Sequence, residues 1–284
     1  EIWESEHPEA AFLRLPSPSL PVEVNEFYEA LDRLKQFQID DFTQILRAMS
    51  AKPVIIRLLD APLHEFLPRH EDLVREVLKL EATGTVEEMI SHGKFLHLVE
   101  SLLESNPMLG HRGCRLGVTF PAIYEMQVEA ITTASACLLK EGLDVHPEIM
   151  IPLTSHVNEM RHLKEKLTKA ADRVQREAGK KVNYLLGTMI EVPRAALTAG
   201  EIAVVAEFFS FGTNDLTQTT YGFSRDDAEG KFLNRYLRDN ILPANPFITL
   251  DHNGVGALIR IAVEQGRRTR PDLEVGICGE HGGD

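Results

Sequence analysis

Short apolar runs rich in Val, Ile and Leu recur along this chain, and longer segments with helical spacing separate them. Runs of this composition are typical of strands buried on both faces. The expected strands are 53–60, 114–120, 147–153, 183–192, 208–216 and 273–280. The clearest helix lies at 123–138, where apolar residues form one stripe before Gly142 ends it. Further helices are predicted at 24–35, 40–51, 94–105, 156–178, 194–206 and 254–268.

Alternating strands and helices predict an α/β fold built on a parallel sheet. A TIM-type (β/α)8 barrel needs eight strands, so six expected strands predict an incomplete barrel with its first and last strands missing. The length of 284 residues suits one domain of this size. We expect residues 1–24 to be an N-terminal extension or connector, which the proline-rich segment 15–21 marks, and residues 25–284 to form the barrel domain, truncated at its C-terminus.

Composition excludes several classes of function. The net charge of −13 opposes non-specific binding to nucleic acid, which depends on clustered Lys and Arg. No apolar run approaches the length of a membrane span, which predicts no membrane role. Three widely spaced cysteines indicate a reducing compartment, and with no secretory signal in view we expect the cytoplasm, without excluding an organellar form.

Two acids stand where expected strands open into loops, Glu191 after YLLGTMI and Asp215 after FFSFGTN. A carboxylate at the end of a buried strand is costly unless a cation or hydrogen-bond donors compensate it. Because the carboxyl ends of neighbouring parallel strands meet on one face, the pair predicts a shared Mg²⁺ with Glu191 and Asp215 as its ligands. Taken singly, Glu191 could instead be a helix-start acid and Asp215 part of an Asx-turn.

The residues beside these acids favour an anion as the ligand. Gly212, Thr213 and Asn214 form a run of turn-forming residues whose backbone amides can bind an anion next to the metal. Arg57 lies inside an apolar strand, where a guanidinium needs a counter-charge, either an anionic ligand or an ion pair with Asp60.

Other basic residues and the histidines give weaker signals. The segment GHRGCR carries Arg112 and Arg115, one of which we expect to point inward. Arg225 by its position alone is a solvated or loop-pinning residue. The histidines lack zinc spacing, and His281 is expected to be a hydrogen-bonded loop residue.

The stretches RLLDAPLHEFLP, NPMLGHRGCRLG, GTMIEVPRAAL, FFSFGTNDLTQTTYGFSRDD and VGICGEHGG occur in that order. Together they resemble the C-terminal phosphoenolpyruvate/pyruvate-binding barrel of the pyruvate, phosphate dikinase family of PEP-utilising enzymes. The resemblance extends from about residue 28 to the end of the chain. Related phosphoenolpyruvate synthases and phosphotransferase-system enzyme I share only the RG and GTND elements.

The resemblance implies a role for each matching residue. Glu191 and Asp215 would hold Mg²⁺. Arg57, Arg112 and Arg225 would meet the phosphate and the enolate oxygen of the ligand. Gly212, Thr213 and Asn214 would cradle its carboxylate. An electrostatic clamp of this kind suits phosphoryl transfer, because metal and arginines stabilise the developing negative charge.

The family's full reaction converts ATP, pyruvate and phosphate to AMP, phosphoenolpyruvate and diphosphate, and a phosphohistidine on another domain carries the phosphoryl group. The nucleotide-binding and phosphohistidine domains would therefore be partners, and a homodimer is implied by resemblance alone. The catalytic cysteine lies on a last strand that this chain stops before reaching, so no catalytic residue is assigned and the fragment is expected to be inactive alone. Two alternatives remain open: a magnesium-dependent enolate lyase or aldolase of similar barrel type, and a non-catalytic binding or dimerisation module.

Overall fold

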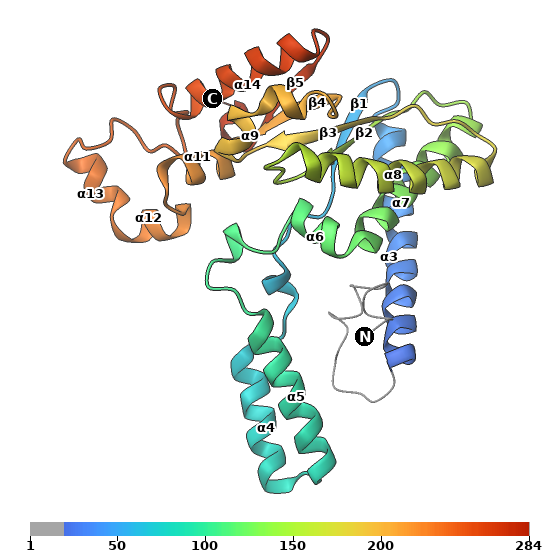
Figure 1. Cartoon of the computed structure of the whole chain (residues 1–284), viewed down its shortest axis with the longest axis vertical. Helices are drawn as coiled ribbons and strands as arrows, with labels where there is room; N and C mark the ends of the chain where they lie inside the picture. Colours follow the sequence, from blue (N-terminus) through green and yellow to red (C-terminus); the bar gives the residue numbers. More distant parts are fainter. Residues whose placement is uncertain (1–19, 284) are drawn as a thin grey trace.

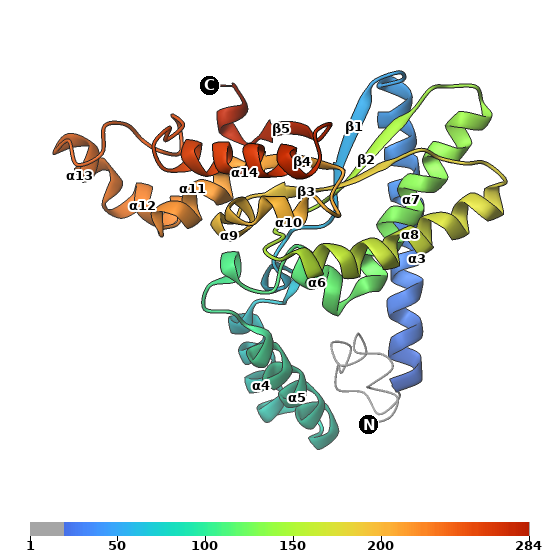
Figure 2. The same ribbon diagram turned by 45° about the horizontal axis from the view of Figure 1, so that its top comes forward.

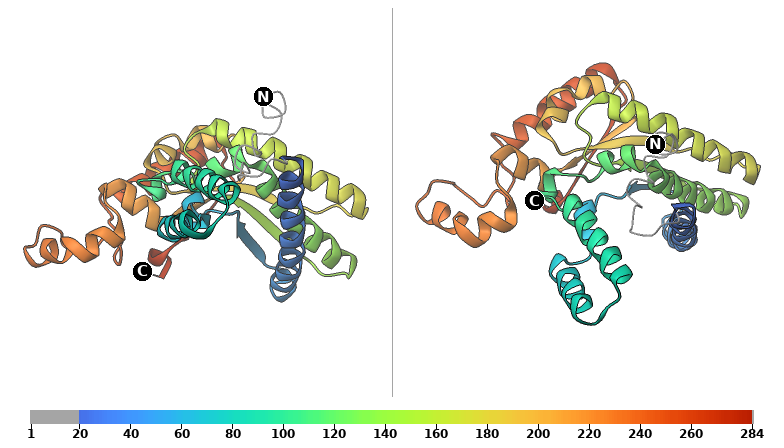
Figure 3. Two further views of the ribbon diagram at one scale, coloured as in Figure 1. Left: turned by 90° about the horizontal axis from the view of Figure 1, so that it is seen from below. Right: turned by 60° about the horizontal axis from the view of Figure 1, so that its bottom comes forward.

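The computed structural model describes residues 20–283 and contains one sheet of five parallel strands in the order β1-β2-β3-β4-β5. The strands are β1 (Pro53–Arg57), β2 (His146–Ile151), β3 (Leu185–Ile190), β4 (Phe208–Gly212) and β5 (Glu274–Cys278). Each strand pairs with the next one along the chain, and the sheet curls into part of a barrel (Figure 3). The predicted α/β fold with a parallel sheet is confirmed, and the open, curled sheet is consistent with an incomplete TIM-type barrel.

Helices and 3-10 turns connect the strands (Figure 1). Before β3 they are α3 (Leu20–Ala48), η1 (Leu63–Phe66), α4 (His70–Thr83), α5 (Val86–Leu102), η2 (Pro107–Leu109), α6 (Cys114–Thr119), α7 (Pro121–Lys140) and α8 (Val157–Ala178). After β3 they are α9 (Pro193–Leu197), α10 (Ala199–Ile202), α11 (Thr213–Tyr221), α12 (Arg225–Lys231), α13 (Leu233–Arg238), α14 (Val255–Thr269) and η3 (Glu280–Gly283).

The main core lies between one face of the sheet and the helices that cover it. Ile149 and Ile151 of β2 and Phe211 of β4 are buried there against α7, α8, α9, α10 and α14. The alternate residues of the strands face the other way, where Met150, Met189 and Phe208 form a smaller cluster. Burial of β2, β3 and β4 on both faces explains their nearly continuous apolar runs. The outer strands β1 and β5 differ, because Ile55 and Ile277 are exposed.

The strand expected at 114–120 is wrong, because residues 114–119 form the short helix α6. A short apolar run has the same composition in a buried strand and in a buried helical turn, so periodicity could not separate them. The packing decides for the helix, since the ring of Tyr124 lies against Gly117, where a Cβ would be only 2.4 Å from ring carbons. The sheet therefore has five strands rather than six.

Several helix boundaries also differ from expectation. The helices expected at 24–35 and 40–51 are one continuous helix, α3, because no Gly or Pro interrupts the sequence between them. Helix α4 was not predicted, since its many charged residues hide a weak apolar face. Residues 1–19 of the predicted extension or connector lie outside the described residues, and the division at residue 25 stays a prediction.

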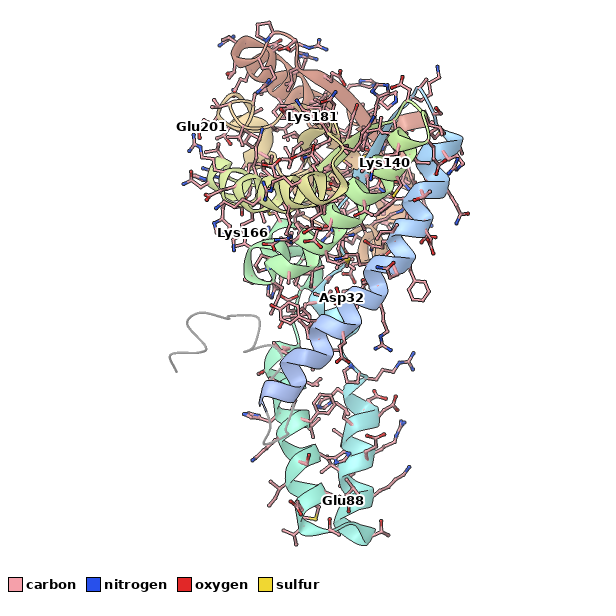
Figure 4. The ribbon with its side chains drawn as sticks, turned by 90° about the vertical axis from the view of Figure 1, so that its right-hand side faces the viewer. Asp32, Glu88, Lys140, Lys166, Lys181 and Glu201 are labelled. Atoms are coloured by element: carbon pink, nitrogen blue, oxygen red, sulfur yellow. The ribbon has the colours of Figure 1, made fainter. Side chains whose placement is uncertain are left out.

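Helices α4 and α5 form a hairpin that projects away from the sheet, and the two helices pack against each other (Figures 1 and 2). Glu88 marks the outer end of this hairpin (Figure 4). At the start of α5, the side chain of Thr85 accepts a hydrogen bond from the backbone N–H of Glu88, and the carboxylate of Glu88 accepts one from the N–H of Thr85. This capping box satisfies two donors at the turn between the helices.

Among residues 20–283, no helix is both long enough and apolar enough to cross a membrane.

Candidate functional site

Three carboxylates meet at the edge of the sheet where the strands end. Glu191 directly follows β3, Asp215 lies in the first turn of α11 after β4, and Asp60 follows β1. Each offers an oxygen, and these oxygens lie within 4.8 Å of one another. The clustering of Glu191 with Asp215 agrees with the parallel strand geometry from which it was predicted.

Glu191 is the most buried of the three acids, with only 1% of its surface exposed. Its Oε1 accepts a hydrogen bond of 2.6 Å from the backbone N–H of Leu153. Loss of hydration, reinforced by the negative charges of Asp60 and Asp215, raises the pKa of Glu191 to about 8. A cation close to Glu191 would stabilise its ionised form, which burial and the neighbouring acids disfavour.

The backbone at Leu153 is unusual, because its φ of 57° lies in the left-handed region that non-glycine residues rarely adopt. Cys114 holds the segment twice: its N–H donates to Pro152 O over 3.1 Å, and its thiol donates to Leu153 O over 3.3 Å. Helix α6 therefore fixes the loop whose N–H contacts Glu191. A strand at 114–120 would not supply this support.

Arg112 lies between two of the acids and is buried, so of the two arginines in GHRGCR it is the one that points inward. Its Nη2 is 2.7 Å from Asp60 Oδ2 and 3.3 Å from Asp215 Oδ2. Arg115 instead donates to the carbonyls of Leu109 and Gly110 at distances of 2.9 and 2.7 Å. The prediction that one arginine reaches inward is confirmed.

Arg57 is the last residue of β1, and its side chain remains 47% exposed. Its Nη1 lies 3.2 Å from Asp60 Oδ2, which is the ion pair considered as the alternative to anion binding. The two interpretations are compatible, because Arg57 also faces the open pocket beside the acids.

Arg225 begins α12 and pairs with Glu229, at 3.3 Å from its Nε, and with Glu280. Its guanidinium carbon also lies 6.0 Å from the centre of the Phe247 ring. These contacts join α12 to the segment after β5, which fits the loop-pinning role expected from the sequence. Arg225 nevertheless stands on the wall of the same pocket.

The pocket has a volume of about 880 Å³ and opens beside the acids. Six of the residues singled out above line it: Arg57, Asp60, Arg112, Asn214, Asp215 and Arg225. Glu191, Gly212 and Thr213 are buried behind this wall rather than on it.

The run Gly212, Thr213, Asn214 begins a helix rather than a turn, because α11 starts directly at Thr213. Gly212 is required where it stands, since a Cβ there would lie 2.5 Å from Glu191 Oε2. Thr213 Oγ1 donates to Cys278 O over 3.0 Å, and Asn214 Oδ1 accepts from the N–H of Glu280 over 3.2 Å. These contacts connect the ends of β4 and β5.

The acidic cluster fits a magnesium ion by its chemistry. Its donors are carboxylate oxygens, which Mg²⁺ prefers, and Glu191 is buried with no ion pair to a basic residue in the part of the chain that the structure describes. Asp60 was missed as a member of the cluster, although it too follows an apolar run, PVIIRLL. The same strand-end argument that selected Glu191 could have found it.

Other candidate groups do not join the site. His281 is buried, and its Nε2 lies 3.0 Å from Pro246 O, as a hydrogen-bonded loop residue would. Among the cysteines, Cys137 is exposed and Cys278 is only partly buried. Burial raises the pKa of the Cys114 thiol, which makes it unreactive.

Comparison with known families identifies the family of this chain. Residues 9–284 match the family described as "PEP-utilising enzyme, PEP-binding domain", where PEP is phosphoenolpyruvate, and the chain belongs to this family. The resemblance stated from the sequence motifs is thereby confirmed.

The relatives that match include named enzymes from three kinds of organism. The pyruvate, phosphate dikinase of Entamoeba histolytica is 51% identical over 89% of this chain and 29% of its own length. The chloroplastic pyruvate, phosphate dikinase 1 of rice (Oryza sativa subsp. japonica) is 53% identical over 90% of this chain and 26% of its own length. The pyruvate, phosphate dikinase of Clostridium symbiosum is 49% identical over 90% of this chain and 28% of its own length. The chain thus spans less than a third of the length of these relatives.

Among solved structures, a citrate lyase from Burkholderia xenovorans LB400 aligns with a TM-score of 0.36 and 15% sequence identity, over 74% of this chain and 61% of that one.

Proposed function

We propose that this chain is the pyruvate-side domain of a pyruvate, phosphate dikinase, and that the pocket at the ends of β1, β3 and β4 binds phosphoenolpyruvate or pyruvate. The observation that carries the proposal is the combination of a buried, cation-deficient acid, Glu191, with Arg112 at the same pocket edge. A site with both features attracts a metal ion and an anion together. Membership of the PEP-binding domain family supports the same ligand.

In this proposal Glu191 and Asp215 hold Mg²⁺, which when bound supplies positive charge to the ligand's oxygens. Arg112 and Arg57 contact the phosphoryl group or the enolate oxygen. A planar guanidinium suits this task, because it can donate two parallel hydrogen bonds to one phosphate. Asn214 and the first backbone amides of α11 face the ligand's carboxylate, where the positive end of the helix favours an anion.

Arg225 takes part by exchanging partners. Its present partners Glu229 and Glu280 are partly exposed, so their ion pairs are weak enough to give way to a doubly charged phosphate. The proposal assigns no proton donor within the chain.

The rest of the reaction involves other parts of a longer protein. We propose that the phosphoryl group moves between the pyruvate enolate and a phosphohistidine on a separate domain, with a nucleotide-binding domain as a further partner. Homodimer formation remains a prediction. The cysteines of the described region are free, which supports the cytoplasm or an equally reducing organelle.

Calorimetric titration of oxalate, a mimic of the enolate, tests the proposal on the 284-residue chain. Binding should require Mg²⁺ and should be lost in Asp215→Ala. Asp226→Ala is the matched control, because Asp226 lines the same pocket but lies outside the acidic cluster. Binding without Mg²⁺, or retained binding in Asp215→Ala, would contradict the proposal.

A further inference from the structure

The three clustered acids are used in different ways. Both oxygens of Asp60 are already engaged by guanidinium groups. Its Oδ2 lies 2.7 Å from Arg112 Nη2 and 3.2 Å from Arg57 Nη1, while its Oδ1 lies 3.3 Å from Arg112 Nε. The backbone carbonyl of Asp60 also accepts from Arg112 Nε, over 3.2 Å. One buried acid therefore holds two arginines from separate parts of the chain.

At Glu191 and Asp215, contacts with guanidinium groups are fewer or longer than the 2.7 Å contact of Asp60 Oδ2. Glu191 accepts one backbone hydrogen bond, through Oε1. Asp215 meets the Arg112 guanidinium at 3.3 and 3.4 Å and Gln218 Nε2 at 3.5 Å, all at or beyond the usual limit of a strong hydrogen bond. A cation that enters the cluster would thus displace few existing contacts at these two acids, whereas at Asp60 it would displace the contacts with two arginines.

From this difference we infer that Asp60 is a positioning residue: it orients Arg57 and Arg112 toward the phosphoryl group of the ligand and leaves Mg²⁺ to Glu191 and Asp215. The inference rests on the proposed function. It assigns to Asp60 the preference of the site for a phosphorylated ligand over an unphosphorylated one, and excludes it as a third metal ligand.

The surroundings of Asp60 suit a fixed support. The side chains of Asp60 and Arg112 are both nearly buried, so water does not compete for their contact. Arg57 is half exposed and would otherwise lose more conformational freedom on binding a phosphate. Asp60 gives it a partner within the wall of the pocket.

The backbone next to Arg112 is shaped to allow this contact. Gly113 has a φ of 57°, and a Cβ there would lie 3.0 Å from Asp60 Oδ1 and 2.7 Å from Leu153 Cβ. A side chain at this position would be strained and would push against the carboxylate. Only glycine lets the segment bring Arg112 onto Asp60 in this way.

The test compares two ligands at saturating Mg²⁺, so that metal affinity does not enter the comparison. Calorimetry measures the Kd of phosphoenolpyruvate and of oxalate for the unsubstituted chain, for Asp60→Asn and for Asp72→Asn. Asp72 is the matched control, because it pairs with Arg75 on the exposed surface of α4, away from the pocket. Mn²⁺ binding to the same proteins is followed by electron paramagnetic resonance.

In Asp60→Asn we expect the Kd of phosphoenolpyruvate to rise at least about thirtyfold, as for loss of one partner of a buried charge pair. The Kd of oxalate should change by no more than about threefold, and one Mn²⁺ should still bind per chain. Asp72→Asn should behave as the unsubstituted chain. An equal loss of both ligands together with loss of Mn²⁺ would make Asp60 a metal ligand and overturn the inference, and so would unchanged or tighter binding of phosphoenolpyruvate.

Asp60→Glu provides a second variant that keeps the buried charge if Asp60→Asn does not fold. It moves the carboxylate by one methylene and should weaken phosphoenolpyruvate selectively, with Mn²⁺ binding retained. Equal effects of this variant on both ligands would also overturn the inference. Failure of the unsubstituted chain to bind either ligand would instead overturn the proposed function, and the inference with it.

Discussion

Two buried glutamates in this molecule have opposite surroundings. Glu129 on α7 is 9% exposed and contacts two cations, Lys35 of α3 at 2.8 Å and Arg173 of α8. Glu191, at the end of β3, is 1% exposed, and within residues 20–283 its carboxylate accepts a hydrogen bond only from a backbone N–H, with two further acids close by. The first glutamate is fully compensated, whereas the second is not.

The difference separates a structural ion pair from the proposed binding site. Glu129 contacts both Lys35 and Arg173, so its charge is compensated by cations from two other helices and the contacts join three helices. Around Glu191 the acids Asp60, Asp215 and Glu191 outnumber Arg112 and Arg57. A cluster with an excess of buried negative charge is stable only when a proton or a metal cation completes it.

The largest expected effect is on the pH dependence of stability without metal. Glu191 has a pKa of about 8 in the folded protein against an ordinary value of 4.5. The folded state thus holds the proton more tightly than the unfolded chain. The contribution of Glu191 is complete below about pH 4.5 and is lost as the pH rises through about 8. The loss should be on the order of 4 kcal/mol, measured by urea unfolding in EDTA between pH 5 and pH 8.5.

Glu191→Gln should remove this pH dependence, whereas Glu129→Gln should keep it. The comparison with Glu191→Gln is needed because Glu148 adds to the same pH dependence. Loss of hydration, together with the charge of Glu274, also raises the pKa of Glu148. If the free energy of unfolding changed with pH equally in the unsubstituted chain and in Glu191→Gln, Glu191 would be ionised at neutral pH without metal.

The next effect concerns metal affinity. Glu191→Gln should weaken Mn²⁺ binding at pH 7.5 by at least about a hundredfold, since even partners outside the coordination sphere cost 10 to 100-fold. Electron paramagnetic resonance of free Mn²⁺ measures it directly. Glu129→Gln provides the control with the same chemical change, and an equal loss of affinity in that variant would break the distinction between the two glutamates.

The smallest effect is the stability cost of Glu129→Gln itself. Breaking a fully buried pair costs about 3–5 kcal/mol, but Arg173 is half exposed and Lys35 partly so, and both can regain water. We therefore expect a loss of about 1–2 kcal/mol, measured by urea unfolding at constant pH. A loss near zero would mean that the ion pairs of this cluster contribute nothing net.

The sequence was sufficient for the parallel sheet and for the pairing of Glu191 with Asp215, because both follow from strand periodicity and strand ends. It was not sufficient for residues 114–120, whose apolar run fits a buried helix as well as a strand. The structure decides for a helix there through contacts with Tyr124 of α7 and with Pro152 after β2, which the apolar run itself does not show.

The balance of charges within the site could not be predicted from the sequence either. Asp60 could have been found as a strand-end acid, but its engagement with two arginines depends on how β1 and the segment at Arg112 meet in space. Likewise, nothing in the spacing of Arg225 indicates that Glu280 would be its partner. The roles assigned to individual site residues remain predictions that the experiments above address.

The order of the strands has a consequence for the time course of folding. Only residues 191–207 separate β3 from β4, whereas residues 58–145, with the α4 and α5 hairpin, separate β1 from β2. Contacts between distant segments form more slowly than local ones. We expect β3 and β4 to pair early, bringing Glu191 and Asp215 together, and β1 to join late with Arg57 and Asp60. A refolding chain would then bring its proposed metal ligands together before Arg57 is in place.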